Sequence, residues 1–136
     1  MAARSKARKR ALDLLFASDL RGESANDALD RAIAEGEAPT NDYTVTLVRG
    51  VVEHQARIDE VLADYSEGWT LDRMPAVDRN VLRLGVYEVL YAEDVPGPVA
   101  VTEAMALVRD LSTDESPAFV NGILGTILRN KPALLG

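Results

Sequence analysis

The feature that most constrains this chain is the spacing of its apolar residues. Across nearly all of its 136 residues they recur at three- and four-residue steps, which places them on one side of a helix. The longest such stretch is capped at Thr40 or Asn41 and reaches Tyr65, which predicts a helix of about six turns. No stretch alternates apolar and polar residues as a half-buried strand would. The sequence therefore predicts an all-α fold.

Glycines and prolines divide this pattern into separate helices. Before Gly68 we expect helices at about 5–20, 24–36 and 40–65, because Gly22, Gly36 and Gly68 end them. After Gly68 the segment 69–74 has room for one short helical turn.

Three further helices are expected in the second half. The first begins with Pro75 at its first position, and its residues up to Leu90 are apolar over much of the circumference, which makes it central. The segment 95–98 is a break, and a helix follows to Leu111. The last helix is capped by Ser116 and ends before Pro132. Helices with one apolar stripe must bury it, so we expect two packed subbundles of three to four helices, 1–67 and 70–136, in one compact domain.

The inventory of reactive side chains argues against an enzyme. There is no cysteine and only one histidine, so thiolate metal sites and paired histidine ligands are excluded. His54 has neither a cysteine nor a second histidine beside it, and we interpret it as a helix-surface residue. Nothing predicts a metal or a cofactor. No apolar run approaches the roughly 18 residues of a membrane span, and a cytoplasmic protein is expected.

Charge is distributed unevenly along the chain. The formal net charge is −7, but the first ten residues hold five basic residues and no acid, while the other 126 hold 10 basic and 22 acidic residues, or −12. The basic start is either a solvated tail or a phosphate-binding arm. Lys9 and Phe16 share one helix face, so Phe16 is either a stacking ring beside the cations or an ordinary core residue.

Four segments resemble the NusB family. They are residues 6–12 with Phe16, 77–90, 94–104 and 112–124, the last reading STDESPAFVNGIL. The resemblance covers nearly the whole chain, and its composition is similar to that of actinobacterial members. Departures from the family pattern are Phe16 in place of a common tyrosine, Thr102 in place of asparagine and Glu115 in place of aspartate.

The resemblance implies an RNA-binding transcription antitermination factor. NusB proteins are all-helical and bind the single-stranded boxA element of nascent RNA with NusE, a ribosomal small-subunit protein, in the transcription elongation complex during ribosomal RNA synthesis. The residues that it implies for RNA binding are Lys6, Arg8, Lys9, Arg10, Phe16, Tyr65, Glu115 and Phe119. For the NusE-facing surface it implies Asp78, Arg79 and Leu82, although the same helix must also supply core.

Two other interpretations stay open at this point. A helical protein–protein adaptor or homodimer with little RNA binding would show the same apolar stripes. An enzyme fragment is the other, because RNA cytosine methyltransferases carry a similar helical region, but the chain lacks the catalytic domain and its cysteine.

Overall fold

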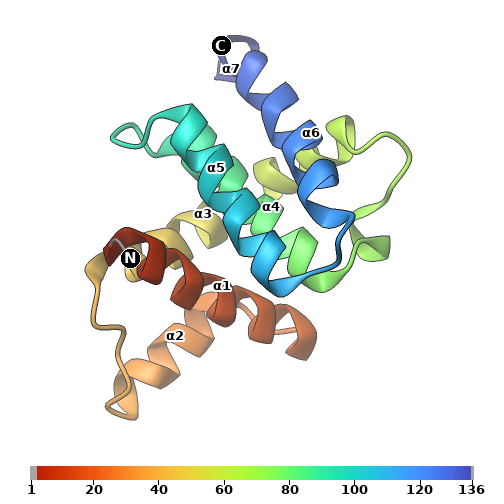
Figure 1. Ribbon diagram of the computed structural model, residues 1–136. Helices are drawn as coiled ribbons and strands as arrows, with labels where there is room; N and C mark the ends of the chain where they lie inside the picture. Colours follow the sequence, from red (N-terminus) through yellow and green to blue (C-terminus); the bar gives the residue numbers. More distant parts are fainter. Residues whose placement is uncertain (1–2, 136) are drawn as a thin grey trace. The chain divides into compact units, whose positions relative to one another are not determined.

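Every regular element among the described residues, 3–135, is helical in a computed structural model of the protein (Figure 1). The all-α prediction is confirmed. The elements are α1 (Ala3–Arg21), α2 (Ala25–Ala34), α3 (Asp42–Tyr65), the 3₁₀ turn η1 (Leu71–Arg73), α4 (Ala76–Tyr91), α5 (Gly97–Leu111), α6 (Ser116–Arg129) and α7 (Lys131–Leu135). None of these helices is both long and apolar enough to cross a membrane.

The chain divides into two compact units inside α3, where the first ends at His54 and the second begins at Gln55. The sequence instead predicts the division at Gly68. The second half of α3 belongs with the later helices because Arg83 of α4 holds Asp59 through two hydrogen bonds of 2.9 and 3.0 Å. Arg57 also donates to the Leu134 carbonyl at 3.3 Å.

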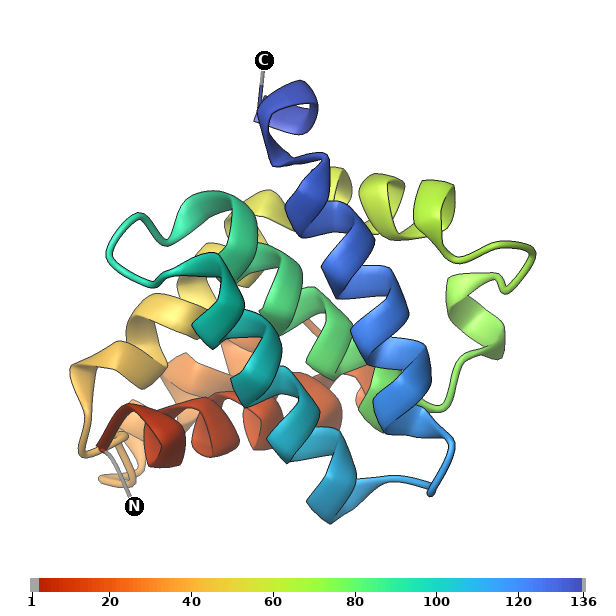
Figure 2. The ribbon, with the colours of Figure 1, turned by 45° about the horizontal axis from the view of Figure 1, so that its top comes forward.

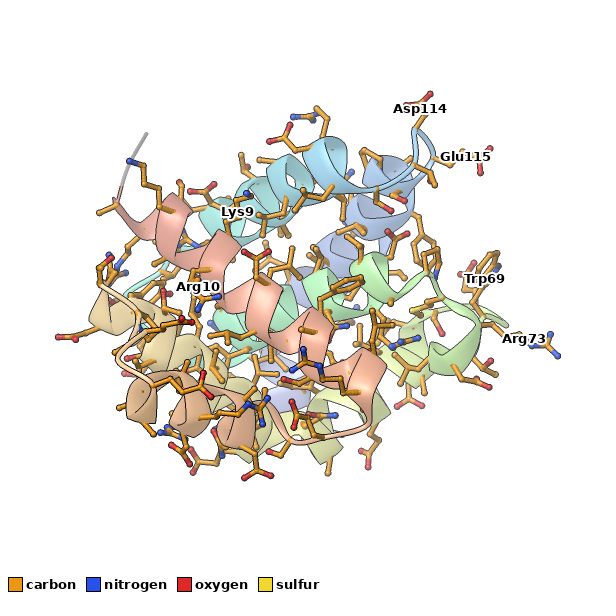
Figure 3. The ribbon with its side chains drawn as sticks, turned by 90° about the horizontal axis from the view of Figure 1, so that it is seen from below. Lys9, Arg10, Trp69, Arg73, Asp114 and Glu115 are labelled. Atoms are coloured by element: carbon orange, nitrogen blue, oxygen red, sulfur yellow. The ribbon has the colours of Figure 1, made fainter. Side chains whose placement is uncertain are left out.

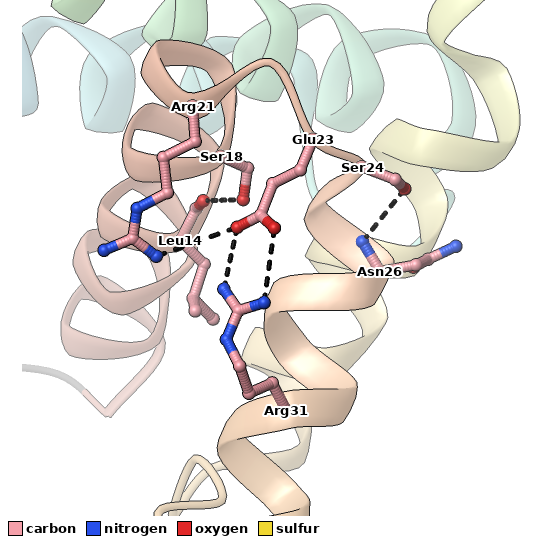
Figure 4. A network of polar contacts seen from close by, with 7 residues as sticks. All are labelled: Leu14, Ser18, Arg21, Glu23, Ser24, Asn26 and Arg31. Carbon is pink, nitrogen blue, oxygen red and sulfur yellow. Dashed lines mark hydrogen bonds and ion pairs between the residues drawn. The ribbon is translucent and has the colours of Figure 1, made fainter.

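In the first unit, α1 and α2 pack together as a helical hairpin (Figure 4). Gly22 adopts a φ of 69°, a left-handed conformation that ends α1. Ser24 then caps α2 by accepting a hydrogen bond from the Asn26 amide at 3.2 Å, as the sequence predicts. Across the hairpin, Glu23 accepts two hydrogen bonds from Arg31, and these contacts fix the connection between the helices.

In the second unit, α4 packs against both α5 and α6 (Figure 2). Eleven of its sixteen residues are buried, so its predicted central place is confirmed. Close packing against α6 depends on Gly85, where an added Cβ would lie 2.7 Å from Leu124 Cδ1. A larger residue at this position would therefore force the buried Leu124 side chain to shift.

The sequence prediction misplaces the starts of several helices by one or more residues. Pro75 is the N-cap of α4 and not its first residue, and Ser116 is the first residue of α6 and not its cap. The break at 95–98 is shorter than expected, because Gly97 and Pro98 already form the first turn of α5. Proline fits there since its missing N–H has no helical partner in a first turn. Pro132 likewise lies inside the short α7, which the sequence analysis missed.

Candidate functional site

The predicted cations of the N-terminal arm lie on α1, so the arm is helical from Ala3 onward and not a tail. Lys6 and Lys9 are exposed, and Arg10 is half-buried. Figure 3 labels Lys9 and Arg10, which are neighbours on this helix. The accessible positive charge of the first unit therefore includes these three side chains.

Contacts with the start of α3 hold this helix in place. Tyr43 lies beneath two guanidinium groups, with its ring centroid 4.1 Å from Arg4 Cζ and 5.6 Å from Arg8 Cζ, distances at which cation–π attraction acts. The Thr44 hydroxyl donates to the Ala7 carbonyl at 3.0 Å. The Asn41 side chain caps α3 through the Tyr43 amide at 2.8 Å and also donates to the Ala3 carbonyl.

Arg8 differs from the other predicted cations because it is only 4% exposed. We therefore correct its expected role: a guanidinium that packs in the interior against Tyr43 is not available to a phosphate in this conformation. Phe16 is half-buried, so neither of its two interpretations, core or stacking surface, is selected by its position alone.

A second set of predicted residues gathers around a groove of about 520 Å³ in the second unit. Tyr65 at the end of α3 and Phe119 on α6 both line it, and so does Trp69, which the sequence analysis did not single out. The Trp69 and Phe119 rings contact each other with centroids 5.8 Å apart and planes tilted by 50°. Aromatic rings at the edge of a groove offer stacking surface to planar ligands.

A smaller groove of about 200 Å³ lies on the same aromatic pair and includes the predicted residue Glu115. Glu115 is exposed and belongs to the loop between α5 and α6. Two hydrogen bonds fix this loop: Ser112 Oγ donates to Asp78 Oδ1 at 2.6 Å, and Ser116 Oγ donates to Asp78 Oδ2 at 2.8 Å. Asp78 thus ties the first turn of α4 to the loop that carries Glu115 and leads to Phe119.

The segment that carries Trp69 is also held by specific hydrogen bonds. Ser66 Oγ donates to the Trp69 carbonyl at 2.5 Å, and Arg79 donates to the carbonyls of Leu71 and Met74 at 3.0 and 3.2 Å. The Thr70 hydroxyl holds the pKa of Asp72 below its usual range, and Arg73 and Arg79 contribute to the same lowering. The turn therefore carries an ionised carboxylate beside the exposed Arg73.

These contacts correct the predicted NusE-facing surface. Leu82 is fully buried and Asp78 is 3% exposed, while the half-buried Arg79 uses its guanidinium to hold the η1 turn. Leu82 supplies core and the other two organise loops. Residue type alone does not distinguish a residue that packs in the core or organises a loop from one that binds a partner. The burial of each side chain is needed to make that distinction.

Among residues 3–135 no group of three or more histidine, cysteine or carboxylate side chains is placed to hold a metal ion. His54 is half-buried on α3.

The candidate residues form two sets, each within one unit. The first set is Lys6, Lys9, Arg10 and Phe16, and the second is Tyr65, Glu115 and Phe119, joined by Trp69. Trp69 could have been noticed because it is the only tryptophan of the sequence and stands in a helix break after Gly68.

Comparison with known proteins places this geometry in context. The model of the NusB family matches residues 5–129. The transcription antitermination protein NusB of a Nocardioides species (strain JS614) is 82% identical over 134 residues, which cover 98% of this chain and 99% of that protein. Among solved structures, the NusB of T. maritima matches with a TM-score of 0.83 at 33% identity, covering 94% of this chain and 92% of that one. A crystal structure of the antitermination factors NusB and NusE in complex with dsRNA matches with a TM-score of 0.80 at 29% identity, covering 93% and 96%.

Proposed function

The chain belongs to the NusB family of transcription antitermination proteins, and from this membership we propose that it binds boxA-type single-stranded RNA together with NusE during ribosomal RNA transcription. It acts by binding RNA and protein in the cytoplasm and not by catalysis. The observation that carries the proposal is the match over 93% of the chain to a NusB that was crystallised with NusE and dsRNA.

The placement of the candidate residues supports a role in RNA binding. Exposed Lys6 and Lys9 can neutralise phosphates, and the grooves at Tyr65 and Phe119 offer rings on which unpaired bases stack. Glu115 lies where it can accept hydrogen bonds from base edges. We propose that these residues, with Arg10 and Phe16, contact the RNA.

The charge distribution explains why a partner is needed. The net charge of −7 disfavours nucleic acid in general, so RNA binding that depends on the cations of α1 is weak and salt-sensitive when the protein acts alone. The same acidic surface attracts a basic ribosomal protein such as NusE and speeds its encounter. A complex that adds the partner's own RNA contacts then binds more tightly than either component.

A pair of matched variants tests the role of the α1 cations. We expect Lys6→Gln with Lys9→Gln to weaken binding of a boxA-like RNA, measured in the presence of NusE. The slope of log affinity against log salt should fall by about 1.4, because each phosphate contact on a single strand contributes about 0.7.

The control removes the same charge elsewhere, through Arg109→Gln with Lys131→Gln, and should leave the slope unchanged. Equal affinity and slope for the two double variants would show that the α1 cations do not contact RNA. If the parent also binds no RNA but forms a dimer or a stable NusE complex, the protein is an adaptor and not an RNA-binding factor.

A further inference from the structure

Trp69 is a large apolar side chain that the fold leaves 52% exposed. Within residues 3–135 its ring contact is with Phe119, which is itself half-buried, so the indole does not close a core. What distinguishes Trp69 from the other exposed apolar side chains is its place in the lining of grooves, where the aromatic surface is open to a ligand.

The backbone around Trp69 is held in a conformation that few sequences adopt. Glu67 has a φ of 45° and Gly68 a φ of 88°, so a non-glycine residue takes up the left-handed region directly before the glycine. The Ser66 hydroxyl and the Trp69 amide both bond across this turn. Strained backbone that the surroundings hold in place is characteristic of functional sites, and here it fixes the main chain from which the indole projects.

The geometry of the ring pair restricts what can bind. With centroids 5.8 Å apart and tilted planes, the Trp69 and Phe119 rings touch each other, so no base can insert between them. Ligands instead lie along the sides of the pair. Trp69 lines three grooves: one shared with Tyr65, one shared with Glu115, and one of about 280 Å³ shared with Gly68 and Arg73.

The charges around these grooves separate bases from phosphates. Asp64 and Glu67 line the groove of Tyr65, and Glu115 lines the smaller one, so a phosphate is repelled from both, while a base amino group finds an acceptor there. The exposed guanidinium of Arg73 lies beside Trp69 and points away from the protein (Figure 3). A strand that stacks a base on the indole therefore finds its phosphate partner next to it.

We propose that Trp69 is a further base-stacking residue for single-stranded RNA and that Arg73 contacts the adjacent phosphate. This inference rests on the proposed function, and it adds a turn of the chain that none of the expected RNA contacts includes. It predicts that bases with exocyclic amines are preferred beside Glu115.

The protein's single tryptophan makes the test direct. Stacking of a base on the indole should quench the intrinsic tryptophan fluorescence when a boxA-like RNA is titrated into the protein with NusE bound. We expect Trp69→Leu to lose about tenfold or more in RNA affinity, since one base–aromatic stack has that effect, and Trp69→Phe to keep most of the affinity because a ring is retained. Leu135→Ala removes another exposed apolar side chain and should change nothing.

Arg73 is tested by the salt dependence of binding. Arg73→Gln should lower the slope of log affinity against log salt by about 0.7, whereas Arg109→Gln should not. Thermal unfolding of each variant, followed by circular dichroism, should show that all of them fold.

The outcomes separate this inference from the proposed function. If the parent binds RNA but its fluorescence does not change and Trp69→Leu binds equally well, the role of Trp69 is wrong and the family function stands. If NusE alone quenches the indole and RNA adds nothing, the grooves are a protein-binding surface and the inference is also wrong. If the parent binds no RNA with or without NusE, the proposed function itself fails.

Discussion

Replacing Asp78 tests whether a buried carboxylate organises the loop that carries Glu115. Its two oxygens accept hydrogen bonds from Ser112 and Ser116 at 2.6 and 2.8 Å, and each hydrogen bond to a charged group is worth about 1.5–3 kcal/mol. Its place in the first turn of α4 adds about 0.5 kcal/mol through the helix dipole.

Two effects offset part of this stabilisation. The carboxylate is 3% exposed, so folding removes its hydration, and Ser116 retains its contacts with Ser112 and Thr113 when the acid is gone. We therefore expect Asp78→Ala to lower the free energy of unfolding by about 2–3 kcal/mol. For a chain of this size that is a decrease in Tm of about 10 °C.

Urea unfolding followed by circular dichroism measures the effect, and Asp78→Asn provides the matched control. The amide keeps the shape and one acceptor oxygen, so about half of the loss is expected. A double-mutant cycle with Ser112→Ala should show coupling, because the two side chains are hydrogen-bonded. An Asp78→Ala protein within about 0.5 kcal/mol of the parent, with no coupling to Ser112, would refute the reasoning.

Three further predictions concern packing and charge. Gly85→Ala should destabilise by about 1–3 kcal/mol because its Cβ would lie 2.7 Å from a buried leucine methyl of α6, whereas Gly122→Ala, in open space, should stabilise slightly; urea unfolding compares them. The side-chain hydrogen bond from Arg31 holds the pKa of Glu23 below its usual 4.5, so its stabilising effect is present above pH 4.5 and lost as the pH falls through the lowered pKa. Glu23→Gln should then be less sensitive to acid in that range, as pH-dependent unfolding would show. Tyr43→Leu should speed amide hydrogen exchange in the first turns of α1, where the arginines lose their ring, while Tyr43→Phe should not.

Much of the fold could be predicted because it follows from periodicity and from residues that act locally. Ser24 and Asn41 cap helices through their own side chains, and Gly68 ends a helix because it adopts a positive φ. Each of these effects depends only on neighbours in sequence. The prediction that Ser116 caps α6 is wrong, because its hydroxyl donates to Asp78, 38 residues away, a contact that local spacing does not contain.

The sequence predicts the types of residue in the candidate site, but it does not predict which of their side chains are exposed to solvent. Lys6 and Lys9 are exposed as a cationic surface requires, yet Arg8, on the same helix, is buried against Tyr43. Asp78 and Leu82 were expected on a docking surface and lie inside. Whether a side chain faces solvent depends on what packs over its helix. A periodic pattern predicts which face of a helix is buried, but it does not predict which residues at the border of that face are exposed.

The most direct test of the proposed function is fluorescence anisotropy of a labelled boxA-like RNA and a scrambled RNA of equal length, each titrated with the protein with and without NusE at two salt concentrations. We predict selective binding of the boxA-like strand, strengthened by NusE and weakened by salt. Equal binding of both strands, or no binding in the presence of NusE, would contradict an antitermination role through boxA and leave NusB family membership to account for the fold alone.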